Sequence, residues 1–160
     1  MQLEIEVEGW PEGAWETLAE RAAQAAASVE PALANPRLEA SILFTSDAEV
    51  HDLNRDWREK DKPTNVLSFP MMEREELLDL PADGPPALLG DIALAQETCA
   101  REAAEKGASL ADHATHLVIH GLLHLAGRDH EISPHDAEEM EALEVKALAQ
   151  LGIADPYGDR

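Results

Sequence analysis

The feature that most constrains the fold is an apolar helical segment over residues 110–125, which carries four histidines, the last two of them four residues apart, and is followed by a glycine. Because side chains at positions i and i+4 lie on the same face of a helix, His120 and His124 point from one side of it. Gly127 readily adopts the left-handed conformation that ends a helix and turns the chain back. The sequence therefore predicts a buried helix, a glycine turn and then His130, which can approach the same point from another side.

Three histidines in this arrangement are suited to a single metal ion. Two ligands from a helix and one from the following loop occupy three corners of a tetrahedron and leave the fourth for water, as in catalytic zinc sites. The chain has one cysteine, so a closed site of clustered cysteines is excluded. Zinc lowers the pKa of its bound water to about 7 and so supplies a nucleophile. We expect one Zn²⁺ per chain, held by His120, His124 and His130. We also expect His120 to be a catalytic residue.

Two further residues are candidates for supporting these ligands. Asp129 can orient a ligand imidazole through a hydrogen bond, and the alternative is an ordinary acidic residue of a surface loop. His116 lies one turn before His120 and can line the site or contact a ligand. A helix carries its more distant turns away from an ion, so we expect His113 to be structural.

The same spacing also matches zinc proteases with the pattern His-Glu-x-x-His-x-x-Gly-x-x-His. In this chain Gly121 stands where such a protease has its glutamate. Glycine cannot take a proton from water, so the metal site remains while the general base is lost. A metallopeptidase is therefore the weaker alternative.

The remaining pattern predicts an α+β fold in one domain over residues 1–160. Leu3, Ile5 and Val7 alternate with glutamates, which is typical of a strand with one solvent-exposed face. We expect a short mixed sheet of about four strands flanked by helices, with the third and fourth strands antiparallel because their connection is short. Residues 73–86 are acidic and proline-rich, and we interpret them as a surface loop. The expected strands are 3–8, 38–44, 65–69 and 90–95, and the expected helices are 11–29, 46–58, 96–106, 110–125 and 133–152.

The sequence also limits where the chain works. It lacks the basic start and apolar run of a secretory signal, and no apolar stretch approaches the roughly 18 residues that a membrane helix needs. Its single cysteine, Cys99, cannot form an intrachain disulfide, which points to a reducing compartment. We therefore expect a cytoplasmic protein with no membrane association.

Two long motifs resemble those of the bacterial YbeY endoribonucleases. The first is the segment over residues 120–130, in which the three histidines, Gly121, Gly127 and Asp129 fit the family's signature. The likeness runs from about residue 42 to residue 157. The second motif comprises Leu53-Asn54 with Arg58, followed by residues 62–70. Shorter matches are residues 89–92, residues 136–141 and Asp155-Pro156-Tyr157.

This resemblance implies a metal-dependent endoribonuclease that is specific for single strands. It implies a role in ribosomal RNA maturation, notably at the 3′ end of the small-subunit RNA, and in ribosome quality control. The expected partners are ribosomal RNA and the ribosome or a protein bound to it. The family's metal histidines correspond to His120, His124 and His130, and its functional arginine corresponds to Arg58.

The residue type at position 58 agrees with this assignment. Phosphodiester cleavage needs a cation that holds the phosphate and stabilises added negative charge, and the planar fork of arginine does this well. On a helix, Arg55, Arg58 and Lys62 would share one face, so Arg55 and Lys62 are candidate RNA contacts. The alternative is an ordinary ion-paired helix surface, because acidic residues lie beside them.

The net charge is interpreted first as an ordinary solvated acidic surface, and it gives slight support to a different class of function. The chain has 33 acidic and 12 basic residues, a formal charge of −21, and such a field repels nucleic acid at long range. The main alternative to an enzyme is thus a ribosome-assembly binding protein whose metal is structural or vestigial. The sequence leaves the oligomeric state and the identity of the general base open.

Overall fold

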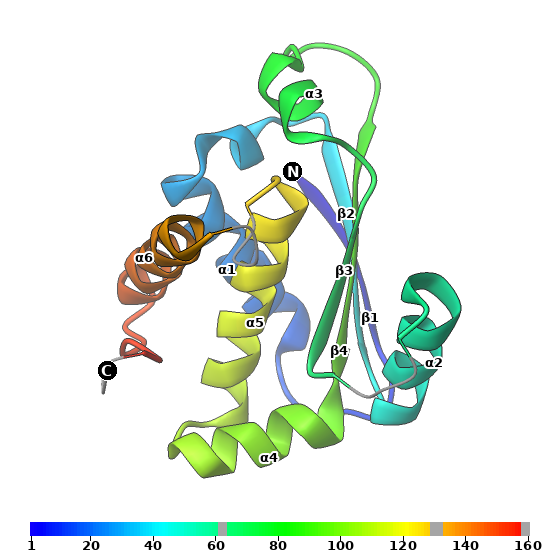
Figure 1. Cartoon of the computed structure of the whole chain (residues 1–160), viewed down its shortest axis with the longest axis vertical. Coiled ribbons are helices and arrows are strands. Elements are labelled where there is room, and N and C mark those ends of the chain that lie inside the picture. The colour runs from blue at the N-terminus through cyan, green and yellow to red at the C-terminus, as the bar shows by residue number, and fades with distance from the viewer. Residues whose placement is uncertain (61–63, 129–132, 158–160) are drawn as a thin grey trace.

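A computed structural model describes residues 1–60, 64–128 and 133–157 (Figure 1). Three of the predicted strands begin or end within two residues of their expected bounds, and the fourth begins three residues earlier. The strands are β1 (Gln2–Val7), β2 (Leu38–Thr45), β3 (Val66–Pro70) and β4 (Ala87–Ala95). The helices are α1 (Trp15–Val29), the 3₁₀ helix η1 (Pro31–Ala34), α2 (Asp47–Arg58), α3 (Arg74–Asp79), α4 (Gln96–Lys106), α5 (Leu110–Leu125) and α6 (Pro134–Gln150).

The four strands form one mixed sheet in the order β1-β2-β4-β3. β2 runs parallel to both β1 and β4, which places Ile5, Ile42 and Ile92 side by side across the sheet. β3 runs antiparallel to β4, with Leu67 opposite Ala93, as the short connection between the two strands predicts. The α+β class and the mixed sheet of four strands are therefore confirmed.

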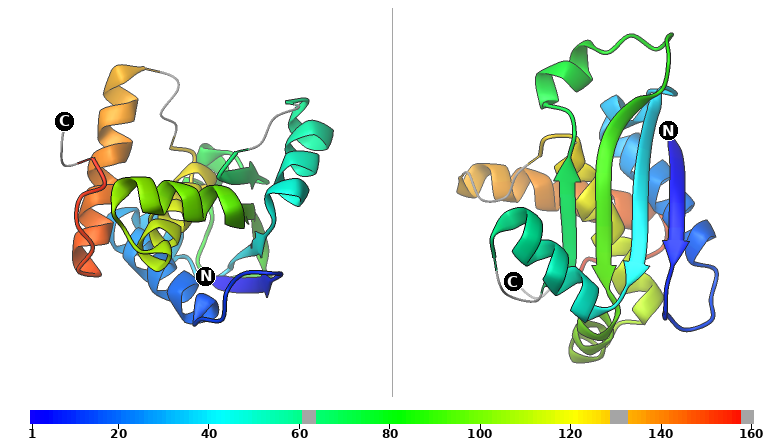
Figure 2. Two further views of the ribbon diagram at one scale, coloured as in Figure 1. Left: turned by 90° about the horizontal axis from the view of Figure 1, so that it is seen from below. Right: turned by 90° about the vertical axis from the view of Figure 1, so that its right-hand side faces the viewer.

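Helix α5 lies at the centre of the molecule. Figure 1 and the left view of Figure 2 show it between the sheet on one side and α1 and α6 on the other. Apolar side chains cover most of its circumference, and residues along its length are buried, as expected for a helix enclosed on all sides. Among the residues that the structure describes, no helix is both long enough and apolar enough to cross a membrane.

Helix α2 covers part of the opposite face of the sheet, on the right of the strands in Figure 1. Val50 and Leu53 pack there against Leu67 and Ala93. Ser46 caps the start of α2 by accepting a hydrogen bond from the backbone N–H of Glu49, which agrees with the expected start of this helix at residue 46. The sheet therefore separates α2 from α5, and the edge strand β3 contacts both helices.

Two interpretations of the sequence are wrong. The first helix begins at Trp15, four residues after its expected start at residue 11. Part of the segment at 73–86 is not a loop, because α3 begins at Arg74 with a capping box formed by Glu73 and Glu76. Leu77 is 3% exposed and joins the core, so burial of this side chain holds the short helix in place. A glutamate at the N-cap and a run of acidic residues obscure this helix in the sequence.

Candidate metal centre

The end of α5 is built as the histidine spacing predicts. The backbone N–H of Gly127 donates to the carbonyl of His124 at 2.9 Å, and that of Arg128 donates to Leu123 at 2.9 Å. This pair of bonds is the Schellman motif, which needs a left-handed residue, and Gly127 has a φ of 91°. The chain therefore turns back directly after the helix that carries His120 and His124.

The two helical histidines lie next to each other on one face of α5. Their ring centroids are 4.6 Å apart and the ring planes cross at 78°. The His120 side chain is 20% exposed, so it is neither enclosed in the core nor fully in solvent. Two imidazoles in this arrangement fit the nitrogen ligands that zinc prefers.

Three other predicted site residues lie outside the described part of the chain. These are His130, Asp129 and Lys62. Within residues 1–60, 64–128 and 133–157, no cluster of three His, Cys, Asp or Glu side chains suited to a metal ion is found. The assignment of His130 as the third ligand and of Asp129 as its supporting acid therefore stays a prediction.

A buried carboxylate that sequence reasoning missed contacts the histidine row. Oε1 of Glu144, on α6, lies 2.9 Å from Nδ1 of His120 and 2.9 Å from Nε2 of His116. Burial would raise the pKa of the Glu144 carboxyl, but the hydrogen bonds from His116 and His120 outweigh burial and lower it to about 2. The carboxylate is therefore ionised at neutral pH and accepts from both rings.

The sequence contains one signal that could have found this residue. The buried positions of α6 form a stripe at helical spacing, namely Met140, Glu144, Ala147 and Leu148. An acidic residue inside an apolar stripe needs donors around it, because an unpaired buried charge is costly. His116, a candidate for contacting a ligand, supplies one of these donors by sharing the carboxylate with His120.

Arg58 occupies the last turn of α2 and is exposed. Because the sheet lies between α2 and α5, Arg58 and the histidines come from elements on opposite sides of the sheet that both contact β3 (Figure 1). Arg55 forms ion pairs with Asp52 at 3.0 Å and with Asp56 at 3.1 Å on the same helix. The surface around Arg55 thus has the ion-paired character that the sequence offered as an alternative, and its role in RNA binding stays a prediction.

Gly121 is required by packing. A Cβ atom at this position would lie 2.9 Å from Cδ1 of Ile92 and 3.2 Å from two further atoms of that side chain. The helix face that would carry a protease's glutamate is therefore pressed against β4. This contact gives a structural reason for the absence of the peptidase base.

Two arginines hold the turn that follows α5. Arg74 donates to the carbonyl of Ala126 at 2.7 Å, and Arg128 donates to the buried carboxylate of Glu30 at 2.8 Å. Arg128 also pairs with Glu139 at 2.7 Å, so it links the end of α1 to α6. These bonds fix the point from which the chain continues toward His130.

Replacing Gly127 with alanine tests how tightly this turn is built. The added Cβ would lie 2.6 Å from Cβ of Arg74, an atom next to the backbone that cannot swing away. Gly152 is a matched control, because it also follows a helix with a positive φ but has no atom within 4 Å of an added Cβ. We expect Gly152→Ala to cost about 1–2 kcal/mol for the left-handed conformation. Gly127→Ala is expected to cost about 1–3 kcal/mol more for overpacking.

Urea denaturation of both variants measures the difference. Equal losses in the free energy of unfolding would contradict the crowding of this turn. A larger loss for Gly127→Ala, accompanied by weaker zinc binding, is the expected result.

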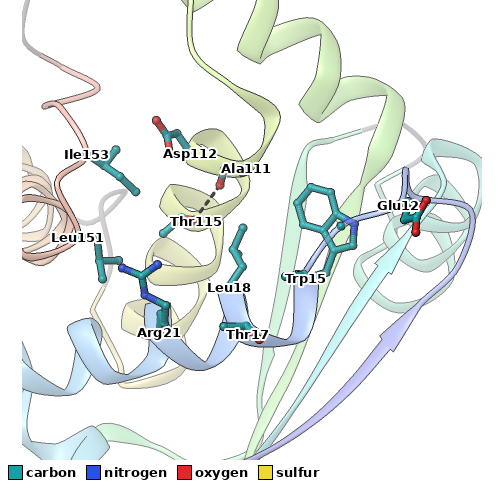
Figure 3. Close-up of a pocket in the computed structure, with 12 residues that line it drawn as sticks. Glu12, Trp15, Thr17, Leu18, Arg21, Ala111, Asp112, Thr115, Leu151 and Ile153 are labelled. Carbon is teal, nitrogen blue, oxygen red and sulfur yellow. Dashed lines mark hydrogen bonds between the residues drawn. The ribbon is translucent and has the colours of Figure 1, made fainter.

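A cavity of about 420 Å³ lies at the opposite end of α5 (Figure 3). Its walls come from the first turns of α1 and α5 and from the segment after α6, and Trp15, Arg21 and Thr115 are among its lining residues. None of the predicted site residues lines it. This cavity is therefore separate from the candidate site, which lies at the other end of α5 with His120 and His124.

Comparison with known proteins identifies the family. A family model described as endoribonuclease YbeY matches residues 2–152. The chain is 69% identical over 160 residues to an endoribonuclease YbeY of Erythrobacter litoralis, with 100% of this chain and 99% of the relative covered. The chain belongs to the endoribonuclease YbeY family. A YbeY relative from Novosphingobium aromaticivorans is 63% identical over 144 residues, with 89% of this chain and 86% of the relative covered.

A solved structure supports the architecture. The solution structure of TM1509 from Thermotoga maritima has a TM-score of 0.59 with this chain and covers 94% of it, with 92% of TM1509 covered. The two sequences are 24% identical, so this similarity concerns the fold alone.

Membership in the YbeY family confirms the resemblance found in the sequence. The relatives are named endoribonucleases, so the family is one of enzymes, hydrolases that act on RNA. The metallopeptidase alternative receives no support, since Gly121 packs against Ile92 and the YbeY relatives bear the name of a nuclease.

Proposed function

We propose that the chain is a zinc-dependent endoribonuclease that cleaves single-stranded ribosomal RNA during maturation of the 3′ end of the small-subunit RNA, and that it acts in ribosome quality control in the cytoplasm. The observation that carries the metal dependence is the adjacent pair His120 and His124, with Nδ1 of His120 held by a buried carboxylate. Membership in the YbeY family supports RNA as the substrate class.

The proposed zinc ion would be held by His120, His124 and His130, one ion per chain. When bound, zinc supplies Lewis-acid chemistry and activates water. Nδ1 of His120 lies 2.9 Å from Oε1 of Glu144, which leaves Nε2 of this ring as the nitrogen that would face the metal.

Arg58 is proposed to bind the phosphate at the cleaved bond. Its guanidinium offers donors in a planar fork that matches phosphate oxygens, and it is exposed at the end of α2, where an RNA strand can reach it. Arg55 and Lys62 would add contacts to neighbouring phosphates.

The strongly acidic chain is proposed to depend on delivery of its substrate. A formal charge of −21 repels free RNA, and three candidate basic residues would neutralise few phosphates. The ribosome, or a protein bound to it, would therefore bring the RNA to the site.

Cleavage of a labelled precursor of the small-subunit RNA, with and without a chelator, tests the function. We expect cleavage by the purified protein in the presence of ribosomal particles, loss of cleavage with the chelator, and recovery when zinc is added. Zinc binding without cleavage under these conditions would instead support an assembly factor with a structural metal. Cleavage that persists in full after zinc has been removed would reject the zinc dependence.

A further inference from the structure

The carboxylate of Glu144 is buried beside a predicted zinc ligand but belongs to none of the ligand positions. It is 1% exposed and sits between α5 and α6. An ionised carboxylate in such a place is stable only when several donors surround it. The donors are the rings of His116 and His120, together with the hydroxyl of Tyr157, which lies 3.2 Å from Oε2.

These contacts determine where each ring carries its proton. Oε1 of Glu144 can only accept, so both nitrogens that face it must be N–H donors. In its neutral form His120 is therefore protonated on Nδ1, and its Nε2 carries the lone pair that a metal requires. His116 is protonated on Nε2, the opposite tautomer, and its buried Nδ1 has no hydrogen-bond partner in the described part of the chain.

A turn near the end of the described chain supplies the third donor. The backbone N–H of Tyr157 donates to Oδ1 of Asp155 at 2.7 Å, which closes a turn through Pro156. This turn brings the Tyr157 ring edge-on to His116, with centroids 5.5 Å apart. The segment Asp155-Pro156-Tyr157, which the proposed chemistry does not use, thus helps to hold Glu144.

We propose that Glu144 is a positioning residue that fixes His120 as its Nδ1–H tautomer and presents Nε2 to the metal. A carboxylate bonded to the far nitrogen of a ligand imidazole orients the ring and raises its basicity, and its loss typically weakens metal binding by about 10–100-fold. This inference rests on the zinc centre proposed above but not on the identity of the RNA.

The first test needs neither a variant nor a metal. Long-range ¹H–¹⁵N spectra of the metal-free protein, recorded over a pH series that extends to the neutral form of both rings, report which ring nitrogen carries each proton. We expect His120 protonated on Nδ1 and His116 protonated on Nε2. Protonation of His120 on Nε2 would overturn the proposal, even if every variant at position 144 failed to fold.

The second test measures zinc affinity by competition with a chelator. Glu144→Gln keeps the shape and an acceptor oxygen but removes the charge, and we expect zinc to bind about 10-fold more weakly or worse. Glu138→Gln makes the same change on an exposed position of the same helix and should leave the affinity unchanged. Glu144→Asp, which retains the charge with a shorter reach, should bind zinc more tightly than Glu144→Gln.

The outcomes separate this inference from the function proposed above. If the wild-type protein fails to bind zinc, the zinc centre and the positioning role both fall. If the wild-type protein binds zinc and Glu144→Gln binds it equally well, the positioning role alone is wrong.

Discussion

Replacing His124 with alanine is expected to remove zinc and abolish RNA cleavage while leaving the domain folded. His124 lies beside His120 on one face of α5, so its loss takes away one of three predicted ligands. Losing a ligand should cost more than the roughly 10–100-fold typical of losing a supporting residue. The domain should survive, because α5 is held by apolar packing against the sheet, α1 and α6.

Elemental analysis after dialysis, chelator competition and circular dichroism measure these effects together. His135→Ala is the matched control, because His135 is on α6 and its side chain is 85% exposed. That variant should retain zinc and activity. A full zinc content in the His124→Ala protein would reject the assignment of this ligand.

The second large effect is expected at Arg58. Arg58→Ala should retain zinc and a folded domain but cleave RNA about 10²–10³-fold more slowly, the usual cost of removing one preorganised donor to developing negative charge. Arg58→Lys should recover little, because an ammonium is a point charge without the two-pronged geometry of guanidinium.

The rate of cleavage at saturating RNA is the quantity to measure. Arg101→Ala provides a control, since it removes an exposed arginine from α4, a helix that carries none of the predicted site residues. Wild-type cleavage by Arg58→Ala would show that this side chain does not bind the reacting phosphate. An equal loss in Arg101→Ala would attribute the effect to net charge.

Much of the fold could be predicted because local patterns and tertiary packing agree. The alternation of Leu3, Ile5 and Val7 with glutamates marks β1, and the cap at Ser46 marks the start of α2. Helix α3 could not be predicted in the same way. A helix of six residues is not stable alone, and here burial of Leu77 and the bond from Arg74 to the end of α5 stabilise it.

The same difference between local sequence patterns and tertiary packing decides which residues of the candidate site could be predicted. The positions of His120 and His124 follow from spacing on one helix, which is local information. The partner of His120 lies 24 residues further along the chain, and α6 carries several glutamates that look alike in the sequence. Only the packing of α6 on α5 selects Glu144 among them.

The origin of this carboxylate in α6 has a consequence during protein synthesis. The ribosome makes the chain from the N-terminus at about 5–20 residues per second, so Glu144 is added roughly 1–5 s after His120. Tyr157 follows later still. A nascent chain therefore contains both predicted helical ligands before it contains the carboxylate that bonds His120, and this contact forms only after α6 has docked on α5.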